Sequence, residues 1–443
     1  MTEPAAQRAI SGALSWLDSP YRLLIRTSLA LGVGAGFSLG VYLLVGFAFG
    51  LPLSAGTPAL MQVHGQVQVF GFLAMFIAAV GVQLFPRFHA TRLDHPAQVS
   101  AGGLLLAAGV VLRAIAQPLP VDTLIRPGAL LLSALLTLFG IVLVVHAFAR
   151  VMRAGAGPPA SGWRALLPAT MGASLILALT LNLAASVELA QGSSVLPFAQ
   201  DEALIHLELW GFASTMVLAV SGRVFPKFLL LQPTREQLIR PALMLWLAGS
   251  IGTPAVWLLL QGAPLARTLT GLAQLVGAVL FVAALRLYEL PARESGTPYV
   301  TNPTRRWVRL AFAMMLSAAA ANLGIAIAEA LGVTASVTQL SAARHLLAQG
   351  FLLPLIVLMA ARILPGYSGS MLHRPRLLAA LVWSLLLGAA LRGAAELIGG
   401  YSPGWSLLVA VGGTLAVVAF TAFAFGLWRA TGRTPLTASR QTH

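Results

Sequence analysis

The sequence contains no cysteine among its 443 residues. A chain without cysteine forms no disulfides, carries no iron–sulfur cluster, binds no haem through a thiolate and attaches none covalently through a CxxCH motif. Any metal ion would have to be held by histidine, methionine, carboxylate or amide groups.

Charged residues are also scarce. They make up 9% of the chain, whereas hydrophobic residues make up 58%, and soluble domains carry roughly a quarter charged residues. A membrane-spanning helix needs about 20 apolar residues. Stretches of this kind predict twelve transmembrane helices in an all-α, polytopic membrane protein, with residues 1–443 forming a single membrane domain. They lie at 23–48, 62–84, 98–117, 128–152, 165–188, 202–224, 240–261, 267–290, 308–331, 341–364, 376–399 and 404–429.

Acidic residues are fewer than basic ones, 13 against 28, and the excess is distributed unevenly. If the amino terminus is cytoplasmic, most basic residues fall on cytoplasmic segments, among them Arg87, Arg92, Arg150, Arg153, Lys227, Arg235, Arg305, Arg306, Arg374, Arg376 and Arg429. The opposite loops keep Arg126, Arg267 and Arg344. This positive-inside bias predicts a multi-pass protein of a bacterial-type inner (plasma) membrane with both termini cytoplasmic. The basic surface then contacts anionic lipid rather than nucleic acid.

One motif occurs three times along the chain. The copies read HGQVQVFGFLAMFIAAVGVQLFPRF, HLELWGFASTMVLAVSGRVFPKF and HLLAQGFLLPLIVLMAARILPGY. They begin at His64, His206 and His345, and their prolines, which we expect to close each helix, are Pro86, Pro226 and Pro365. Even spacing of a long apolar motif defines the architecture. It predicts three pseudo-symmetric four-helix units, roughly 23–153, 164–291 and 308–430, with the motif on helices 2, 6 and 10.

The three motif histidines are candidate metal ligands. An ionisable side chain within a membrane span indicates a functional site, because leaving it unpaired is expensive; the alternative is a hydrogen bond to a neighbouring helix. His206 and His345 precede their motif glycine by five residues, but His64 precedes Gly71 by seven and Gln66 takes the equivalent place. Two helical residues rotate a side chain by about 200° and shift it by about 3 Å. The symmetry is therefore broken at the histidine, where a local function would break it.

Glycines and arginines accompany these histidines. Gly71 and Gly350 allow close approach of another helix, the simpler interpretation, or of a flat ligand. Arg113, Arg344 and Arg392 lie near the same outer ends. They form interhelical ion pairs or neutralise the carboxylates of a buried cofactor such as haem propionates, since guanidinium groups bind carboxylates bidentately.

This layout resembles the catalytic subunit of haem-copper oxidases. His64 resembles the low-spin haem ligand on helix 2 of that superfamily. His206 falls where its helix 6 copper ligand lies, and His345 falls where its helix 10 haem ligands lie.

A closer resemblance is to the NnrS family, membrane proteins related to those oxidases and linked to the nitric oxide response. The stretch H-x-Q-x4-G-F from His64 is similar to that family's H-x-H-E-x2-F-G-F. The helix 10 stretch H-x4-G…R-x3-G-Y-S-G is similar to its H-x4-G…R-x3-G-H-T-G. It comprises His345, Gly350, Arg362, Gly366, Tyr367, Ser368 and Gly369. The resemblance implies haem b, with copper as a further candidate cofactor.

The chain departs from both patterns. Gln66 stands where the NnrS family has a second histidine, and Tyr367 replaces the histidine of its Gly-His pair. Compared with the oxidases, helix 7 lacks the paired copper-ligating histidines and helix 10 has one histidine instead of two. Reduction of oxygen or nitric oxide at a haem–copper pair is therefore not favoured.

The leading hypothesis is a haem-binding membrane protein of NnrS type in nitric oxide response or tolerance. In it, His64 and His345 ligate haem b, with Arg392, Arg344 and Arg113 near the propionates and nitric oxide or another diatomic gas as a partner. His206, with Glu202 or Glu208, is a candidate for copper, although one histidine with carboxylates is a poor Cu(I) site. Two alternatives stay open. One is a small-solute transporter or channel built from repeats; the other is a degenerate reductase, a haem-dependent oxidoreductase. No electron partner is indicated.

Overall fold

The computed structural model describes residues 19–51, 56–155, 163–292, 302–363, 374–399, 402 and 404–432. Pro365 and the stretch Gly366–Gly369 lie outside these residues. The described part is all-helical, with no strand, and twelve of its helices are long and apolar enough to cross a membrane. This confirms the predicted fold class and number of spans.

Helical segments follow one another within four of the spans. These are α2–η1–α3 (Pro20–Leu31, Gly32–Phe37, Ser38–Ala48), α4–η2–α5 (Thr57–Gln66, Val67–Ala74, Met75–Phe88), α9–η3–α10 (Phe198–His206, Leu207–Ser214, Thr215–Phe228) and α14–η4–α15 (Val337–Leu347, Ala348–Leu352, Leu353–Ile363). The other eight spans are single helices: α6 (Pro96–Ala116), α7 (Arg126–Ala154), α8 (Trp163–Ala190), α11 (Glu236–Leu259), α12 (Pro264–Leu285), α13 (Asn302–Ala330), α17 (Pro375–Ile398) and α18 (Trp405–Gly432).

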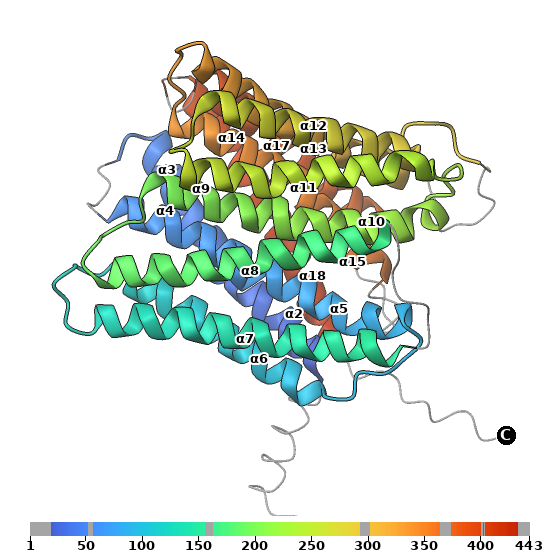
Figure 1. The fold of residues 1–443 in the computed structure, drawn as a ribbon, viewed down its shortest axis with the longest axis horizontal. Coiled ribbons are helices and arrows are strands. Elements are labelled where there is room, and N and C mark those ends of the chain that lie inside the picture. Colours follow the sequence, from blue (N-terminus) through green and yellow to red (C-terminus); the bar gives the residue numbers. More distant parts are fainter. Residues whose placement is uncertain are drawn as a thin grey trace, which may run out of the picture.

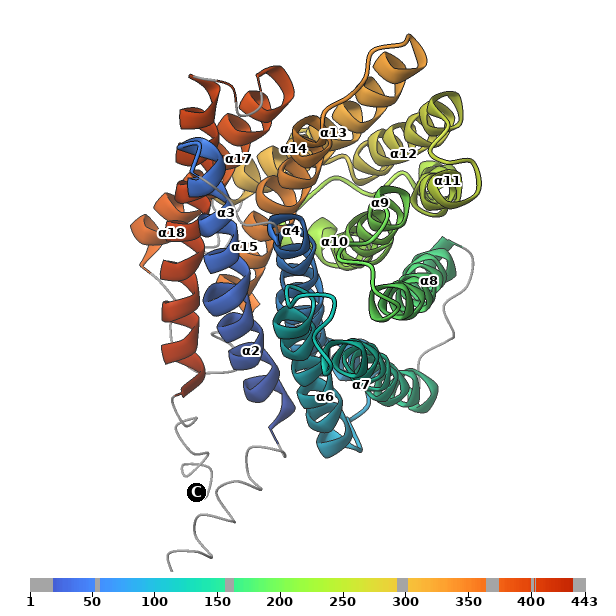
Figure 2. The ribbon, with the colours of Figure 1, turned by 90° about the vertical axis from the view of Figure 1, so that its left-hand side faces the viewer.

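The three spans that carry the motif form the centre of the molecule. Seen along the bundle, α4, α9, α10, α14 and α15 are surrounded by the other helices (Figure 2). In their most apolar windows 67%, 72% and 72% of residues are buried, against 33–50% in the other nine spans. The polar groups of these central spans are therefore shielded from lipid, as an ionisable group in a membrane requires.

Helix packing is similar across the predicted units. The most extensive contacts join α6 to α7, α11 to α12 and α17 to α18, which are the third and fourth spans of each unit. The first two of these pairs lie side by side in Figure 1. Glycines permit two of these crossings. A Cβ on Gly102 would lie 2.7 Å from the Gly140 carbonyl oxygen, and one on Gly388 would lie 2.6 Å from that of Gly412. Small residues allow helix backbones to approach closely in membranes. The pseudo-symmetry of the units stays a prediction.

Each central span contains a π-helical segment at its Gly-Phe pair. Gly71 lies within η2, Gly211 within η3 and Gly350 within η4. A π-helical turn inserts an extra residue into an α-helix and is frequent at functional sites. The sequence periodicity gave no sign of these segments, because a π turn changes the phase of a helix without changing its apolar composition.

The two motif prolines that the structure describes do not end their helices, contrary to expectation. Pro86 lies within α5, which continues to Phe88, and Pro226 lies within α10, which continues to Phe228. Just beyond the two helix ends, Ala90 and Leu230 adopt a left-handed conformation. The residue after each of them donates its backbone N–H to the proline carbonyl five residues earlier, at 2.9 Å and 3.0 Å. This is the Schellman arrangement. Proline lacks a backbone N–H but keeps its carbonyl oxygen, so it can accept this hydrogen bond.

The predicted eighth span was also too long. Instead of reaching residue 290, α12 ends at Leu285, where Arg286 adopts a left-handed conformation with φ of 55°. The Arg286 side chain ion-pairs with Glu289, which also pairs with Arg235 at 2.9 Å. The apolar run thus continues past the end of the helix.

Candidate functional site

The three central spans form a bundle with two different ends. The histidine end comprises the ends of the three central spans that carry His64, His206 and His345, and the proline end carries Pro86 and Pro226. Both ends are built from the motif, so the helices that place the histidines also place the prolines.

The His64 imidazole lies against the first span. Its Nδ1 is 2.8 Å from the carbonyl oxygen of Gly36. A Cβ on Gly40 would lie 2.8 Å from the ring, so only glycine leaves room for it there. Because a carbonyl only accepts hydrogen bonds, Nδ1 must carry the proton. The lone pair on Nε2 is then available, and no hydrogen bond to Nε2 is present within the described residues.

The His345 imidazole is held in the same way by a carboxylate. Its Nδ1 lies 3.1 Å from Oε2 of Glu396 and 3.0 Å from the Ser341 hydroxyl. Glu396 is fully buried, and its other oxygen accepts a hydrogen bond from Nε of Arg392 at 2.9 Å. The chain Arg392–Glu396–His345 fixes the ring and leaves Nε2 with no partner in the described part of the chain.

The two histidines share one electrostatic environment. Arg392 lies near both rings, since its Nε donates to Glu396, which holds His345, and its charge is close enough to affect the electrostatics at His64. The structure therefore brings His64, His345 and Arg392 together at the histidine end, from the second, tenth and eleventh spans.

His206 occupies separate surroundings. Its ring stacks on Trp210 with centroids 5.9 Å apart and faces a small cavity of about 40 Å³. Glu202, Arg267 and Asn322 line the same cavity. Nε2 of His206 is buried without a partner among the described residues.

The carboxylates proposed to join His206 at copper differ in their contacts, and Oε2 of Glu208 is buried without a partner among the described residues. Glu202 forms an ion pair with Arg344, and Glu208 accepts a hydrogen bond from Gln66 at 3.1 Å. Within the ranges the structure covers, no three His, Cys, Asp or Glu residues are grouped as metal ligands. Copper at His206 stays a prediction.

The three arginines fall into different clusters. Arg113 donates hydrogen bonds to Asn182 and, at 3.0 Å, to Gln117, within a buried network that reaches Gln62. Arg344 connects the tenth span to the sixth through Glu202. Of the three, Arg392 is the one that acts on both His64 and His345.

The motif glycines face flanking helices. A Cβ on Gly71 would lie 3.1 Å from Val110 of α6, and one on Gly350 would lie 2.9 Å from Met314 of α13. Gly211 lies in the same way against Ser174 of α8. These contacts are those of helix packing, and contact of Gly71 or Gly350 with a cofactor stays a prediction.

Glu396, the most informative residue of the site, is not among the candidate residues predicted from the sequence. The signal was present in the stretch LRGAAE, where Arg392 and Glu396 are four residues apart and share one helical face. The hydrogen bond between Gln66 and Glu208 was not predicted either. Gln66 was interpreted only as the loss of a candidate histidine ligand, whereas in the structure its side chain donates to Glu208.

The fold and these contacts define an all-helical membrane protein whose central helices hold three histidines, one buried and two partly buried, each with a ring nitrogen that has no partner among the described residues. Comparison with known families identifies it further. The model of the NnrS protein family matches residues 28–434, nearly the whole chain, and the chain belongs to this family. No curated protein matches it.

Proposed function

We propose that this NnrS-family chain binds haem b through His64 and His345 and acts in the response or tolerance to nitric oxide. The nitric oxide role rests on the resemblance stated for the motifs, and haem binding rests on the arrangement of the two imidazoles.

The observation that carries the proposal is the shared state of the two rings. Each has its Nδ1 held by an acceptor, the Gly36 carbonyl at 2.8 Å or the Glu396 carboxylate at 3.1 Å, and each keeps Nε2 available. Metal-ligating histidines typically donate their other ring N–H to a carbonyl or carboxylate, which fixes the tautomer and strengthens the ligand. The Nε2 atoms of His64 and His345 would therefore hold the iron of haem b, and the residues at the histidine end suit this role.

The surrounding residues have distinct roles in this proposal. Glu396 orients His345 and, being ionised beside Arg392, increases its basicity as a ligand. Arg392 is the first candidate for a propionate contact, because it lies close to both imidazoles and its Nε already holds the carboxylate that orients His345. When bound, haem would supply an iron that changes oxidation state, and this iron could take a diatomic gas once one of the two imidazoles leaves it.

The two alternative functions find less support. Transporters of the repeat type bind solutes at broken helices, whereas each of the twelve spans is continuously helical over the residues described. A reductase needs a second redox centre, and His206 with Glu202 or Glu208 would be a poor ligand set for Cu(I).

The optical spectrum of the purified protein tests the proposal. We expect a Soret band with reducible α and β bands in the wild type. His64→Ala and His345→Ala should each lose haem or shift these bands, because each removes an axial nitrogen. Added imidazole should restore the wild-type bands in part, since a free imidazole can enter the space left by the ring.

Two further histidine variants provide controls. His146→Ala removes a ring that contacts Gln98 at 3.0 Å on the exposed surface, and His206→Ala removes the third motif histidine. Both should keep the wild-type bands. A colourless wild type, or unchanged bands in both His64→Ala and His345→Ala, would refute the assignment.

A further inference from the structure

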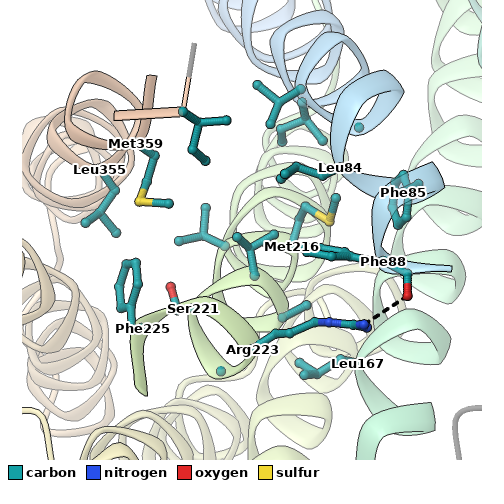
Figure 3. A pocket seen from close by; sticks show the side chains of 18 of the residues that line it. Leu84, Phe85, Phe88, Leu167, Met216, Ser221, Arg223, Phe225, Leu355 and Met359 are labelled. Carbon is teal, nitrogen blue, oxygen red and sulfur yellow. Dashed lines mark hydrogen bonds between the residues drawn. The ribbon is translucent and has the colours of Figure 1, made fainter. Parts of the chain in front are cut away.

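A large cavity lies at the proline end, away from the histidines. It has a volume of about 800 Å³, within the usual range of small-molecule sites. The second, sixth and tenth spans form most of its wall, and α8 contributes Leu167 and Met171 (Figure 3). Its first residue on the second span, Phe76, follows His64 by twelve positions, or roughly 18 Å of helix. The cavity is therefore distinct from the site at the histidine end.

The body of the cavity is apolar and adaptable. Its wall is mostly aliphatic and aromatic and includes Met152, Met171, Met216 and Met359. The sulfur atom of Met359 points from α15 into the cavity, and Met216 lies beside Leu84 and Phe88 of α5 (Figure 3). Methionine side chains are flexible and polarizable, so they fit apolar ligands of varying shape. The wall therefore suits a hydrocarbon chain.

Polar groups gather at one part of the wall. The charged or titratable ones are His89, Arg223, Lys227 and Glu236. Arg223 reaches from α10 to the end of α5, where it donates a hydrogen bond to the Phe88 carbonyl at 3.0 Å and covers the Phe88 ring at 4.3 Å. This uses one of its five N–H donors. Lys227 is exposed and makes no hydrogen bond or ion pair within the described residues.

The electrostatic balance of this part is positive. Arg223 and Lys227 outweigh Glu236, and burial together with the Arg223 charge lowers the pKa of His89 below its usual range. The His89 ring is then neutral at pH 7, and the remaining charge is cationic. An anionic group could therefore accept hydrogen bonds from Arg223 and from the Lys227 ammonium, while the apolar part of the same molecule lies in the cavity between the membrane spans.

We infer that this cavity binds an amphipathic molecule with a hydrocarbon body and a single anionic head group, its body between α5, α10 and α15 and its head at Arg223 and Lys227. A long-chain carboxylate and the phosphate of an anionic lipid share this chemistry.

Photocrosslinking locates such a ligand directly. The probe is a long-chain fatty acid with a diazirine near the end of its tail, applied to the full-length protein in neutral detergent and mapped by mass spectrometry. We expect saturable labelling of peptides from α10 and α15. Competition by oleate alone assigns a carboxylate, and competition by phosphatidylglycerol alone assigns a lipid phosphate; both support an anionic head.

Variants test separately the contact with the anionic head group and the contact with the hydrocarbon body of the ligand. Arg223→Gln should weaken probe binding about tenfold, because it removes a charge-assisted contact at the rim. Ala219→Phe places a ring in the cavity and should weaken it further, since Ala219 lines the wall. The matched control is Arg429→Gln, because Arg429 covers the Phe425 ring at 4.5 Å but does not line the cavity.

Several results would overturn the inference. These are labelling that does not saturate, labelling confined to other spans, equal competition by a trimethylammonium amphiphile of the same chain length, and equal binding by all three variants. The haem bands of Arg223→Gln should stay those of the wild type, so a failure here is distinguishable from a failure of the proposed function.

Discussion

A single buried carboxylate determines how the His345 ring is presented. Glu396 is fully buried, and both of its oxygens are used, one by His345 and one by Arg392. An ionised carboxylate in the bilayer interior is tolerated only when it is paired in this way. The pairing therefore has two consequences, one for the stability of the eleventh span and one for the tautomer of the ring.

Glu396→Gln should weaken haem binding without abolishing it. The amide still occupies the space, but it no longer provides a charged acceptor for Nδ1–H and so reduces the basicity of Nε2. Loss of such a partner typically costs 10–100-fold in metal affinity. Haem retention during dilution, followed at the Soret band, measures the effect, and the reduction midpoint should shift as well.

The control for this variant is Glu329→Gln. Glu329 also pairs with an arginine within the spans, Arg267 of α12, but it does not contact His64 or His345. Both variants leave an arginine without its carboxylate, so both should lower thermal stability. Equal haem retention in the two variants would show that Glu396 acts through stability alone.

The central spans are shaped by glycines at their π-helical segments. At Gly350 the flanking helices approach so closely that a Cβ would lie 2.9 Å from Met314 and 3.1 Å from Ala389. Gly324, on α13, has no atom within 4 Å of the same position. Of these two glycines in neighbouring spans, only Gly350 lacks room for a side chain.

Gly350→Ala should destabilise the protein, whereas Gly324→Ala should not. The methyl group at 350 forces α13 or α17 to move, which costs about 1–3 kcal/mol in a well-packed interior. At 324 it lowers the conformational freedom of the unfolded chain and adds helix propensity, for a gain of up to about 1 kcal/mol. Thermal unfolding in detergent distinguishes them, and equal midpoints would contradict the packing argument.

These elements also show what a sequence can and cannot predict. The spans were predictable because the length of an apolar run depends only on neighbouring residues. The prediction for α12 was too long because Arg286 adopts a left-handed backbone conformation and ends the helix within an apolar run. The histidines were predictable as ionisable groups in spans. Their partners were not, since Gly36 and Glu396 are 28 and 51 residues away from His64 and His345, and only the packed structure brings them together.

At the scale of the whole molecule, polar contacts connect the three central spans at the histidine end. Gln66 joins the second span to the sixth through Glu208, and Arg344 joins the tenth to the sixth through Glu202. At the proline end, the same spans diverge around the cavity. The molecule is thus polar and closed at one end and apolar and open between helices at the other.

The orientation of these two ends in the membrane stays a prediction of the charge distribution, and the absence of cysteine makes it testable. A single cysteine is the sole reactive thiol in an otherwise wild-type chain. His95 precedes α6 at the proline end, Ser194 lies between α8 and α9 at the histidine end, and both are exposed. We expect a membrane-impermeant maleimide to label Ser194→Cys in intact spheroplasts and to label His95→Cys only after lysis. Labelling of His95→Cys in intact spheroplasts, with Ser194→Cys protected, would invert the protein and place the proposed anionic-ligand cavity on the outer side, against the positive-inside rule.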